Sequence, residues 1–125
     1  MILDTNALSA FAEGDTKLQK LLEPATELYL PSIVLGEYLF GIGQSKFREQ
    51  YESWLETSLN ILRPLTVGRK TAAAYAAIRK NLKAAGTPIP ENDIWIAAIT
   101  HEHKMPLVTR DAHFKQIKSI QVLKW

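Results

Sequence analysis

Four acidic side chains lie in largely apolar stretches of this sequence, and together they could bind a divalent cation. They are Asp4, Glu37, Asp93 and Asp111. Carboxylates that share an apolar site repel one another unless a cation lies between them. The chain has no cysteine, and oxygen ligands alone select hard ions such as Mg²⁺ or Mn²⁺. Such a site can polarise a phosphate and lower the pKa of bound water, so phosphodiester hydrolysis is the predicted chemistry.

Asp93 lies where an apolar helix is expected to begin. Pro88 and Pro90 disfavour helix just before them, so the helix should start at Asn92 or Asp93. Residues 94–99 are all apolar, and this helix should therefore be buried on most of its circumference. Taken alone, an acid in the first helical turn is more often a cap, stabilised by roughly 0.3 to 1 kcal/mol. Only the combination with the other acids favours a functional role.

Glu37 is the one charged residue in the segment 33–42, where every other residue is apolar or glycine. This pattern predicts a helix that is buried nearly all round and carries one carboxylate into the core. A buried carboxylate must be paired, protonated or bound to a metal. The sequence leaves a Lys or Arg partner and a metal as equal alternatives. An apolar surface around Tyr38 and Phe40 is a candidate for contact with a partner.

The elements that position these acids alternate along the chain. Strands are expected over 1–3, 27–30, 60–64, 107–109 and 120–123, and helices over 7–11, 17–22, 33–42, 45–58, 67–85 and 92–104. The alternation predicts an α/β fold with a mostly parallel central sheet of about four to five strands and helices on both faces. Ligands bind outside the carboxyl ends of such strands, where Asp4 and Asp111 fall, although either acid alone could simply cap a turn.

Composition agrees with a soluble globular protein. The chain has 125 residues, 46% of them hydrophobic and 22% charged, and we expect one domain over residues 1–125. The net charge of +2 neither requires nor excludes nucleic acid as a ligand. No signal peptide or membrane span is expected, so the protein should be cytoplasmic. Six basic residues could contact phosphates: Arg79, Lys80, Lys83, Arg110, Lys115 and Lys118.

The histidines and other motifs add little. His101 and His103 are two apart on a predicted helix and cannot share a face, which argues against a zinc pair. His113 follows Asp111 by two residues and could lie near the site, but a surface or capping role is the expectation for it. A phosphatase with Asp4 as nucleophile would need a second acid where the chain has Asn6. A catalytically silent binding module, with its acids in internal salt bridges, is the other alternative.

In order along the chain, the motifs resemble those of PIN-domain ribonucleases, and most of all the VapC toxins of bacterial toxin-antitoxin pairs. The matching segments are Asp4-Thr5-Asn6, Glu37 in its apolar helix, Asn92-Asp93 before Ile94-Trp95-Ile96-Ala97-Ala98, and Thr109-Arg110-Asp111 with Phe114 after it. The likeness covers nearly the whole chain. It implies a PIN-like fold and a Mg²⁺- or Mn²⁺-dependent endoribonuclease, with Asp4, Glu37, Asp93 and Asp111 as its catalytic, metal-binding acids.

The resemblance also implies supporting residues and partners. Asn6 and Thr109 match positions that orient the acids or bound water. The implied substrate is structured RNA such as tRNA or rRNA. The implied partners are a second copy of the chain in a homodimer and a VapB-type antitoxin, which occludes the site in a higher-order complex. Only three residues precede Asp4, so the first strand should be shorter than is usual in the family.

Overall fold

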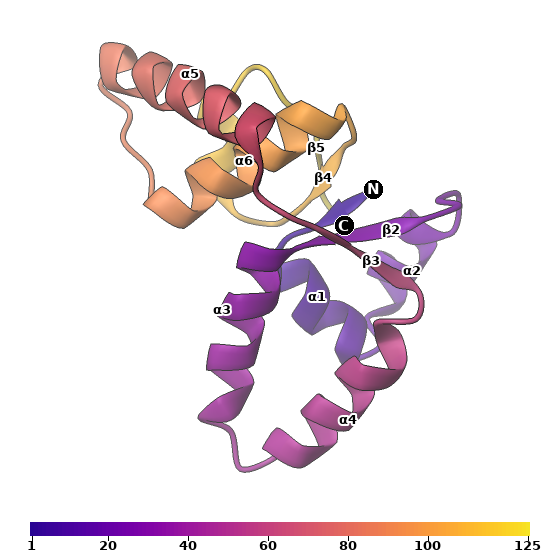
Figure 1. Ribbon diagram of the computed structural model, residues 1–125. Coiled ribbons are helices and arrows are strands. Elements are labelled where there is room, and N and C mark those ends of the chain that lie inside the picture. Colours follow the sequence, from indigo (N-terminus) through magenta and orange to yellow (C-terminus); the bar gives the residue numbers. More distant parts are fainter.

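A five-stranded parallel sheet forms the centre of the protein (Figure 1). The computed structural model describes all 125 residues, with the strands in the order β3-β2-β1-β4-β5. The elements are β1 (Ile2–Leu3), α1 (Thr5–Ala12), α2 (Thr16–Leu22), β2 (Leu28–Pro31), α3 (Ser32–Gly43), α4 (Arg48–Ser58), β3 (Leu62–Leu65), α5 (Arg69–Ala85), α6 (Glu91–His103), β4 (Leu107–Val108), the 3₁₀ helix η1 (Ala112–Gln116) and β5 (Val122–Leu123). The predicted α/β class is confirmed, and the sheet is entirely rather than mostly parallel.

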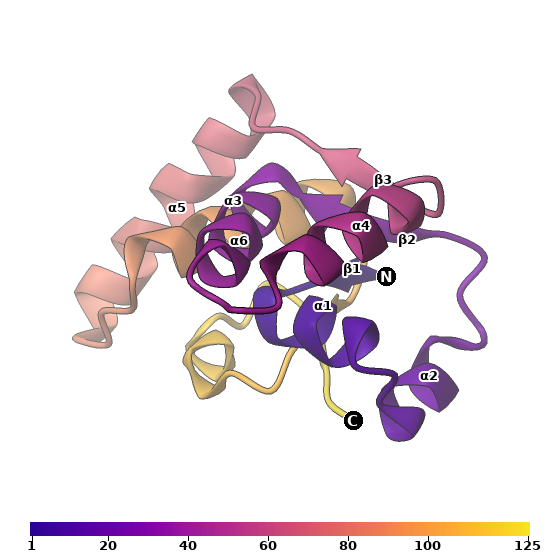
Figure 2. The same cartoon turned by 90° about the horizontal axis from the view of Figure 1, so that it is seen from below.

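Helices cover both faces of this sheet. Figure 1 shows α5 and α6 on one side and α1, α3 and α4 on the other, and the turned view in Figure 2 agrees. Between these layers β1 and β4 are fully buried, as their unbroken apolar sequences require. On the outer side, Tyr75 of α5 stacks on Trp95 of α6 with ring centroids 3.9 Å apart. No helix is both long enough and apolar enough to cross a membrane.

The chain changes direction across the sheet at β1. It passes from β1 to β2 and β3 through α1 to α4, then returns through α5 and α6 to β4 on the other side of β1. Strands β1 and β4 pair in register, with Leu3 opposite Val108. A ligand site in such a fold lies at the carboxyl ends of the strands where the direction reverses. Asp4 and Thr109 directly follow these two strands, so both lie at that point.

Helix α6 carries Asp93 into the same region. It begins at Glu91, whereas the prediction was a start at Asn92 or Asp93. Pro90 precedes it in an extended conformation with φ −53° and ψ 143°. Asp93 is thus in the first turn, and the residues from Ile96 to Thr100 are buried as predicted. The preceding helix α5 ends at Ala85 and is capped by Gly86. The φ of Gly86 is 68°, in the left-handed region, which carries no steric penalty for glycine.

Three expectations about the other half of the fold were wrong. Helix α3 is not buried nearly all round, because its neighbours cover only part of its circumference and leave Phe40 72% exposed. Tyr38 is not a surface residue: it is buried, with its ring centroid 6.3 Å from that of Trp54. Pro64 lies within β3 rather than closing it, and β3 is an edge strand, where a missing N–H is tolerated.

Candidate active site

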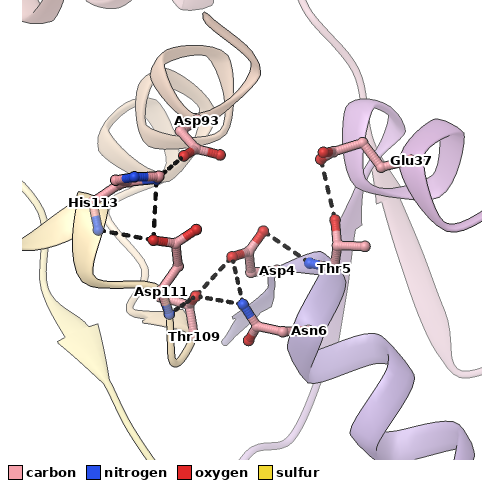
Figure 3. Close-up of polar contacts among 8 residues, drawn as sticks. All are labelled: Asp4, Thr5, Asn6, Glu37, Asp93, Thr109, Asp111 and His113. Carbon is pink, nitrogen blue, oxygen red and sulfur yellow. Dashed lines mark hydrogen bonds and ion pairs between the residues drawn. The ribbon is translucent and has the colours of Figure 1, made fainter. Parts of the chain in front are cut away.

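Asp4 is buried between the end of β1 and the first turn of α1. Its Oδ1 accepts a hydrogen bond from the backbone N–H of Thr5 at 2.8 Å. Its Oδ2 accepts from the hydroxyl of Thr109 at 2.6 Å and from the amide of Asn6 at 3.2 Å (Figure 3). These three donors come from the two strand ends that meet at the direction change. They fix the carboxylate in one orientation despite its burial.

Thr109 links the two strand ends through a single hydroxyl. Besides donating to Asp4, its Oγ1 accepts from the Asn6 amide at 3.1 Å and from the backbone N–H of Asp111 at 3.0 Å. The Asn6 side-chain oxygen in turn accepts from the backbone N–H of Arg110 at 3.1 Å. Thr109 is fully buried, so water cannot replace any of these partners. The network therefore sets both Asp4 and the turn that carries Asp111.

Glu37 faces Asp4 from α3. It is only partly buried, so the expectation that it carries a charge into the core was wrong. Its Oε1 accepts from the hydroxyl of Thr5 at 3.1 Å, and Figure 3 shows its carboxylate directed towards the other acids. None of the four acids forms an ion pair with a lysine or arginine. This excludes the basic partner that the sequence had left open for Glu37.

Asp93 and Asp111 meet at the ring of His113. The Nδ1 atom lies 2.9 Å from Asp93 Oδ2 and 3.1 Å from Asp111 Oδ1. The same Asp111 oxygen accepts from the backbone N–H of His113 at 2.8 Å. A purely surface or capping role for His113 was therefore the wrong expectation. The two-residue spacing in the sequence could have indicated that His113 lies beside Asp111. A capping Asp accepts from the backbone N–H two residues further on, and so holds that residue close to its carboxylate.

Burial raises the pKa of Asp4. The hydrogen bonds from Thr109 and Thr5 act in the opposite direction, and the negative charges of Asp93 and Glu37 raise the pKa further. An ionised Asp4 is thus destabilised both by its surroundings and by its acidic neighbours. The structure supplies hydrogen-bond donors to this carboxylate but no positive charge from a lysine or arginine.

Burial also raises the pKa of Asp93. The hydrogen bond from His113 opposes that effect, the charge of Asp111 adds to it, and the charge of His113 again opposes it. The acids are therefore electrostatically linked in series: Asp4 feels the charges of Glu37 and Asp93, and Asp93 feels that of Asp111. A cation between them would remove the repulsion.

The donor set fits a hard divalent cation. It consists of carboxylate oxygens from four separate elements and one imidazole nitrogen, without a competing lysine or arginine. Single donor atoms of Asp93, Asp111 and His113 all lie within 4.8 Å of one another, as ligands of one ion must. The site can therefore hold a metal ion, with Asp4 and Glu37 facing it from the other side.

The six basic residues predicted to contact phosphates divide into two groups. Both arginines are engaged elsewhere: the Arg110 guanidinium lies 4.1 Å from the centroid of the Trp125 ring, and Arg79 donates to the Tyr75 hydroxyl at 2.7 Å. The four lysines are exposed and form no ion pair: Lys80, Lys83, Lys115 and Lys118. Only the lysines keep their charge free for a ligand.

A parallel α/β fold with converging acids at its direction change defines a known family. The sequence matches the model of the PIN domain over residues 1–120. The chain therefore belongs to the PIN-domain family, as its motifs predicted. Among its relatives, Ribonuclease VapC2 of Rickettsia felis is 30% identical over 129 aligned residues, which cover 99% of this chain and 96% of the relative. Ribonuclease VapC4 of Mycobacterium tuberculosis is 29% identical over 93 aligned residues, which cover 73% of this chain and 72% of the relative.

Solved structures also match the fold of this chain. The structure of VapBC2 from Rickettsia felis, bound to a DNA fragment from its promoter, superposes with a TM-score of 0.90 at 28% identity, covering 99% of this chain and 97% of that chain. FitAcB from Neisseria gonorrhoeae superposes with a TM-score of 0.83 at 26% identity, covering 98% and 95%. The PIN-like fold is thus confirmed over almost the entire chain.

The raised pKa of Asp93 predicts a pH-dependent stability without metal. Protonated Asp93 is the form that the fold favours, so its contribution is fully present below the ordinary pKa of 3.8 and is lost as pH rises through the raised value. Relative to the Asp93→Asn variant, the wild-type protein should lose melting temperature in EDTA as pH rises above 3.8. Thermal unfolding of both proteins across this range tests the prediction. A wild-type protein that gains stability over the variant as pH rises would contradict it.

Proposed function

We propose that this protein is a Mg²⁺- or Mn²⁺-dependent endoribonuclease of the VapC type. In this proposal residues 1–125 form a single PIN domain that cleaves structured RNA such as tRNA or rRNA. The observation that carries the proposal is the meeting of four acids, without a lysine or arginine partner, at the direction change of a PIN-domain sheet. The relatives named Ribonuclease VapC support the same activity.

In the proposed mechanism, Asp4, Glu37, Asp93 and Asp111 would hold the ion. When bound, the ion supplies a Lewis acid for the scissile phosphate and lowers the pKa of a water molecule. Thr5 orients Glu37 through its 3.1 Å hydrogen bond. In the same way, Thr109 and Asn6 orient Asp4 and the turn that carries Asp111. These positioning residues keep the acids in place before the substrate arrives, so little reorganisation is needed at the reacting phosphate.

A groove beside Glu37 is the proposed path of the RNA strand. It has a volume of about 530 Å³ and is lined by Thr5, Ile33, Gly36, Glu37, Phe40 and Asn92. Phe40 is 72% exposed there, and an exposed aromatic ring can stack on an unpaired base. The lysines that follow Asp111 would contact phosphates on the other side of the acids. Base stacking beside phosphate cleavage fits a single-stranded region within a folded RNA.

The proposal includes the partners that the family resemblance implied. We propose an inhibitory VapB-type antitoxin, a homodimer and a cytoplasmic location, where the RNA is found. The support is that the Rickettsia felis neighbour is a VapBC2 complex on promoter DNA. Light scattering after size-exclusion chromatography, with and without the co-expressed antitoxin, measures both assemblies. A monomer that binds no antitoxin would remove this part and leave the proposed nuclease activity standing.

We expect cleavage of RNA to require a divalent cation. The purified chain is incubated with a mixed pool of structured RNAs in Mg²⁺, in Mn²⁺ or in EDTA. Cleavage with either ion and none in EDTA is the expected result, because the acids cannot act on a phosphate while they only repel it. Cleavage that continues in EDTA would contradict the metal mechanism. Absence of cleavage in all three conditions, with no ion bound by calorimetry, would favour the catalytically silent PIN-like module instead.

A further inference from the structure

The ring of His113 contacts two acids, although one acid would be enough to hold it by a hydrogen bond. Its Nδ1 atom contacts Asp93 Oδ2 at 2.9 Å and Asp111 Oδ1 at 3.1 Å at the same time. The two carboxylates come from different elements, α6 and the residue before η1. The ring nitrogen therefore lies at the junction of the two segments, against Asp93 and Asp111 at one side of the group of acids (Figure 3).

These separations match those between neighbouring ligands of one octahedral ion. Bonds of about 2.1 Å place adjacent ligand atoms about 3.0 Å apart, and opposite ones about 4.2 Å apart. The two measured contacts agree with the first value, and all three donor atoms lie within 4.8 Å of one another. The atoms are thus already spaced as ligands, and an ion could bind with small movements of the side chains.

The chain around His113 holds the ring in this position. Asp111 caps η1 and accepts from the backbone N–H of His113 at 2.8 Å. Phe114, the next residue, is fully buried, and so anchors the turn to the core. In the metal-free protein Nδ1 carries the proton of the hydrogen bond to Asp93, so binding the ion requires the other tautomer, with a free electron pair on Nδ1 and the proton on Nε2. The side chain is 49% exposed, so water can accept a hydrogen bond from Nε2.

We propose that His113 is a nitrogen ligand of the bound ion and makes this site prefer Mn²⁺ over Mg²⁺. The inference rests on the proposed metal site of the nuclease. Mg²⁺ takes oxygen ligands and keeps several waters, whereas first-row transition ions such as Mn²⁺ also accept imidazole nitrogen. Four carboxylates alone would suit both ions. A nitrogen among them favours Mn²⁺, and the choice of ion is then set by a residue outside the acidic set.

Pulsed EPR of the Mn²⁺-loaded protein tests the ligand directly. We expect hyperfine coupling from a histidine nitrogen in the wild-type protein, with the coupling changed by ¹⁵N-histidine labelling. The coupling should persist in His101→Gln, because His101 is exposed and its ring nitrogen Nδ1 is within hydrogen-bond distance of Ser119 O, at 3.3 Å, rather than of an acid. It should vanish in His113→Gln. The labelled wild-type measurement does not depend on the folding of any variant.

Calorimetry with each ion alone tests the preference. Loss of even an outer partner of a metal ligand typically lowers affinity by about 10- to 100-fold, so loss of the ligand itself in His113→Gln should weaken Mn²⁺ binding by about 10-fold or more. Mg²⁺ binding should change little, because the amide oxygen of glutamine can replace the nitrogen for a hard ion. Equal losses for both ions would overturn the preference. Tighter binding of both ions would also overturn it, because His113 would then be a placeholder that the ion displaces.

The outcomes separate this inference from the proposed function. Bound Mn²⁺ without nitrogen coupling would remove His113 as a ligand and leave a site made of acids alone. Nitrogen coupling in a protein that cleaves no RNA would support the ligand and contradict the nuclease. A protein that binds no Mn²⁺ at all would contradict both.

Discussion

Asp93→Asn is expected to lower RNA cleavage by at least about 100-fold while leaving the fold intact. Asparagine keeps the shape of the side chain but removes the negative charge needed to hold a cation. It can still accept a hydrogen bond from the His113 ring, which lies 2.9 Å from Asp93 Oδ2. In EDTA the variant should melt at or above the wild-type temperature at neutral pH, because burial raises the pKa of Asp93 and disfavours its charged form. Cleavage rates and thermal unfolding, measured on the same preparations, check both parts.

Glu91→Gln provides a matched control for this experiment. Glu91 lies in the same first turn of α6, two residues before Asp93, and the substitution removes the same charge. Its contacts lie outside the site: the Tyr75 hydroxyl at 2.9 Å and the Arg79 guanidinium at 3.7 Å. We expect cleavage within about 2-fold of the wild-type rate, in line with the small energies of surface ion pairs. Retained activity in Asp93→Asn would remove Asp93 from the site, and an equal loss in Glu91→Gln would assign the effect to the helix rather than to the ligand.

Thr109→Val is expected to destabilise the protein by about 1 to 3 kcal/mol, measured by urea denaturation in EDTA. Valine has almost the same shape, so packing is kept and only the hydroxyl is lost. Buried Asp4 then loses its 2.6 Å donor, and the backbone N–H of Asp111 loses its acceptor. Because the lost hydrogen bond favours the charged carboxylate, the pKa of Asp4 should rise further and metal binding should weaken.

Thr100→Val is the corresponding control for Thr109. Thr100 is also buried, but its hydroxyl donates to the carbonyl of Ile96 within α6 at 2.8 Å and touches no acid. That carbonyl keeps its place in the helix, so the variant should lose less than about 1 kcal/mol and no metal affinity. If both variants reduced metal affinity equally, or if Thr109→Val bound the ion normally, the positioning role of Thr109 would be wrong.

The parts of the fold that follow from local chemistry were predictable. Short apolar segments alternating with helical ones predicted the parallel sheet. Gly86 and Pro88 predicted where α5 ends, and Pro88 and Pro90 predicted where α6 begins, to within two residues. Asp4 and Asp111 could be placed together because the carboxyl ends of parallel strands meet at one edge. These predictions needed only the order of elements and the chemistry of their ends.

Other features depend on which neighbour covers which surface, and this the sequence does not contain. Helix α3 is apolar on nearly every side apart from Glu37, yet it leaves Phe40 exposed and Tyr38 buried, because its packing partners lie on particular sides. His113 looked like a surface residue because half of its side chain is indeed exposed. Only the approach of α6 to the turn after β4 shows that the other half of the ring joins two acids.

The proposed function requires the acids at the direction change of the sheet to hold one or more divalent cations. Anomalous diffraction from crystals grown with Mn²⁺ can locate such ions. We expect a strong anomalous peak at bonding distance from the carboxylates of Asp4, Glu37, Asp93 and Asp111, and a weak or absent peak in Asp93→Asn crystals. Well-ordered carboxylates in Mn²⁺-containing crystals with no peak between them, or a lysine or arginine moved into that position, would contradict it.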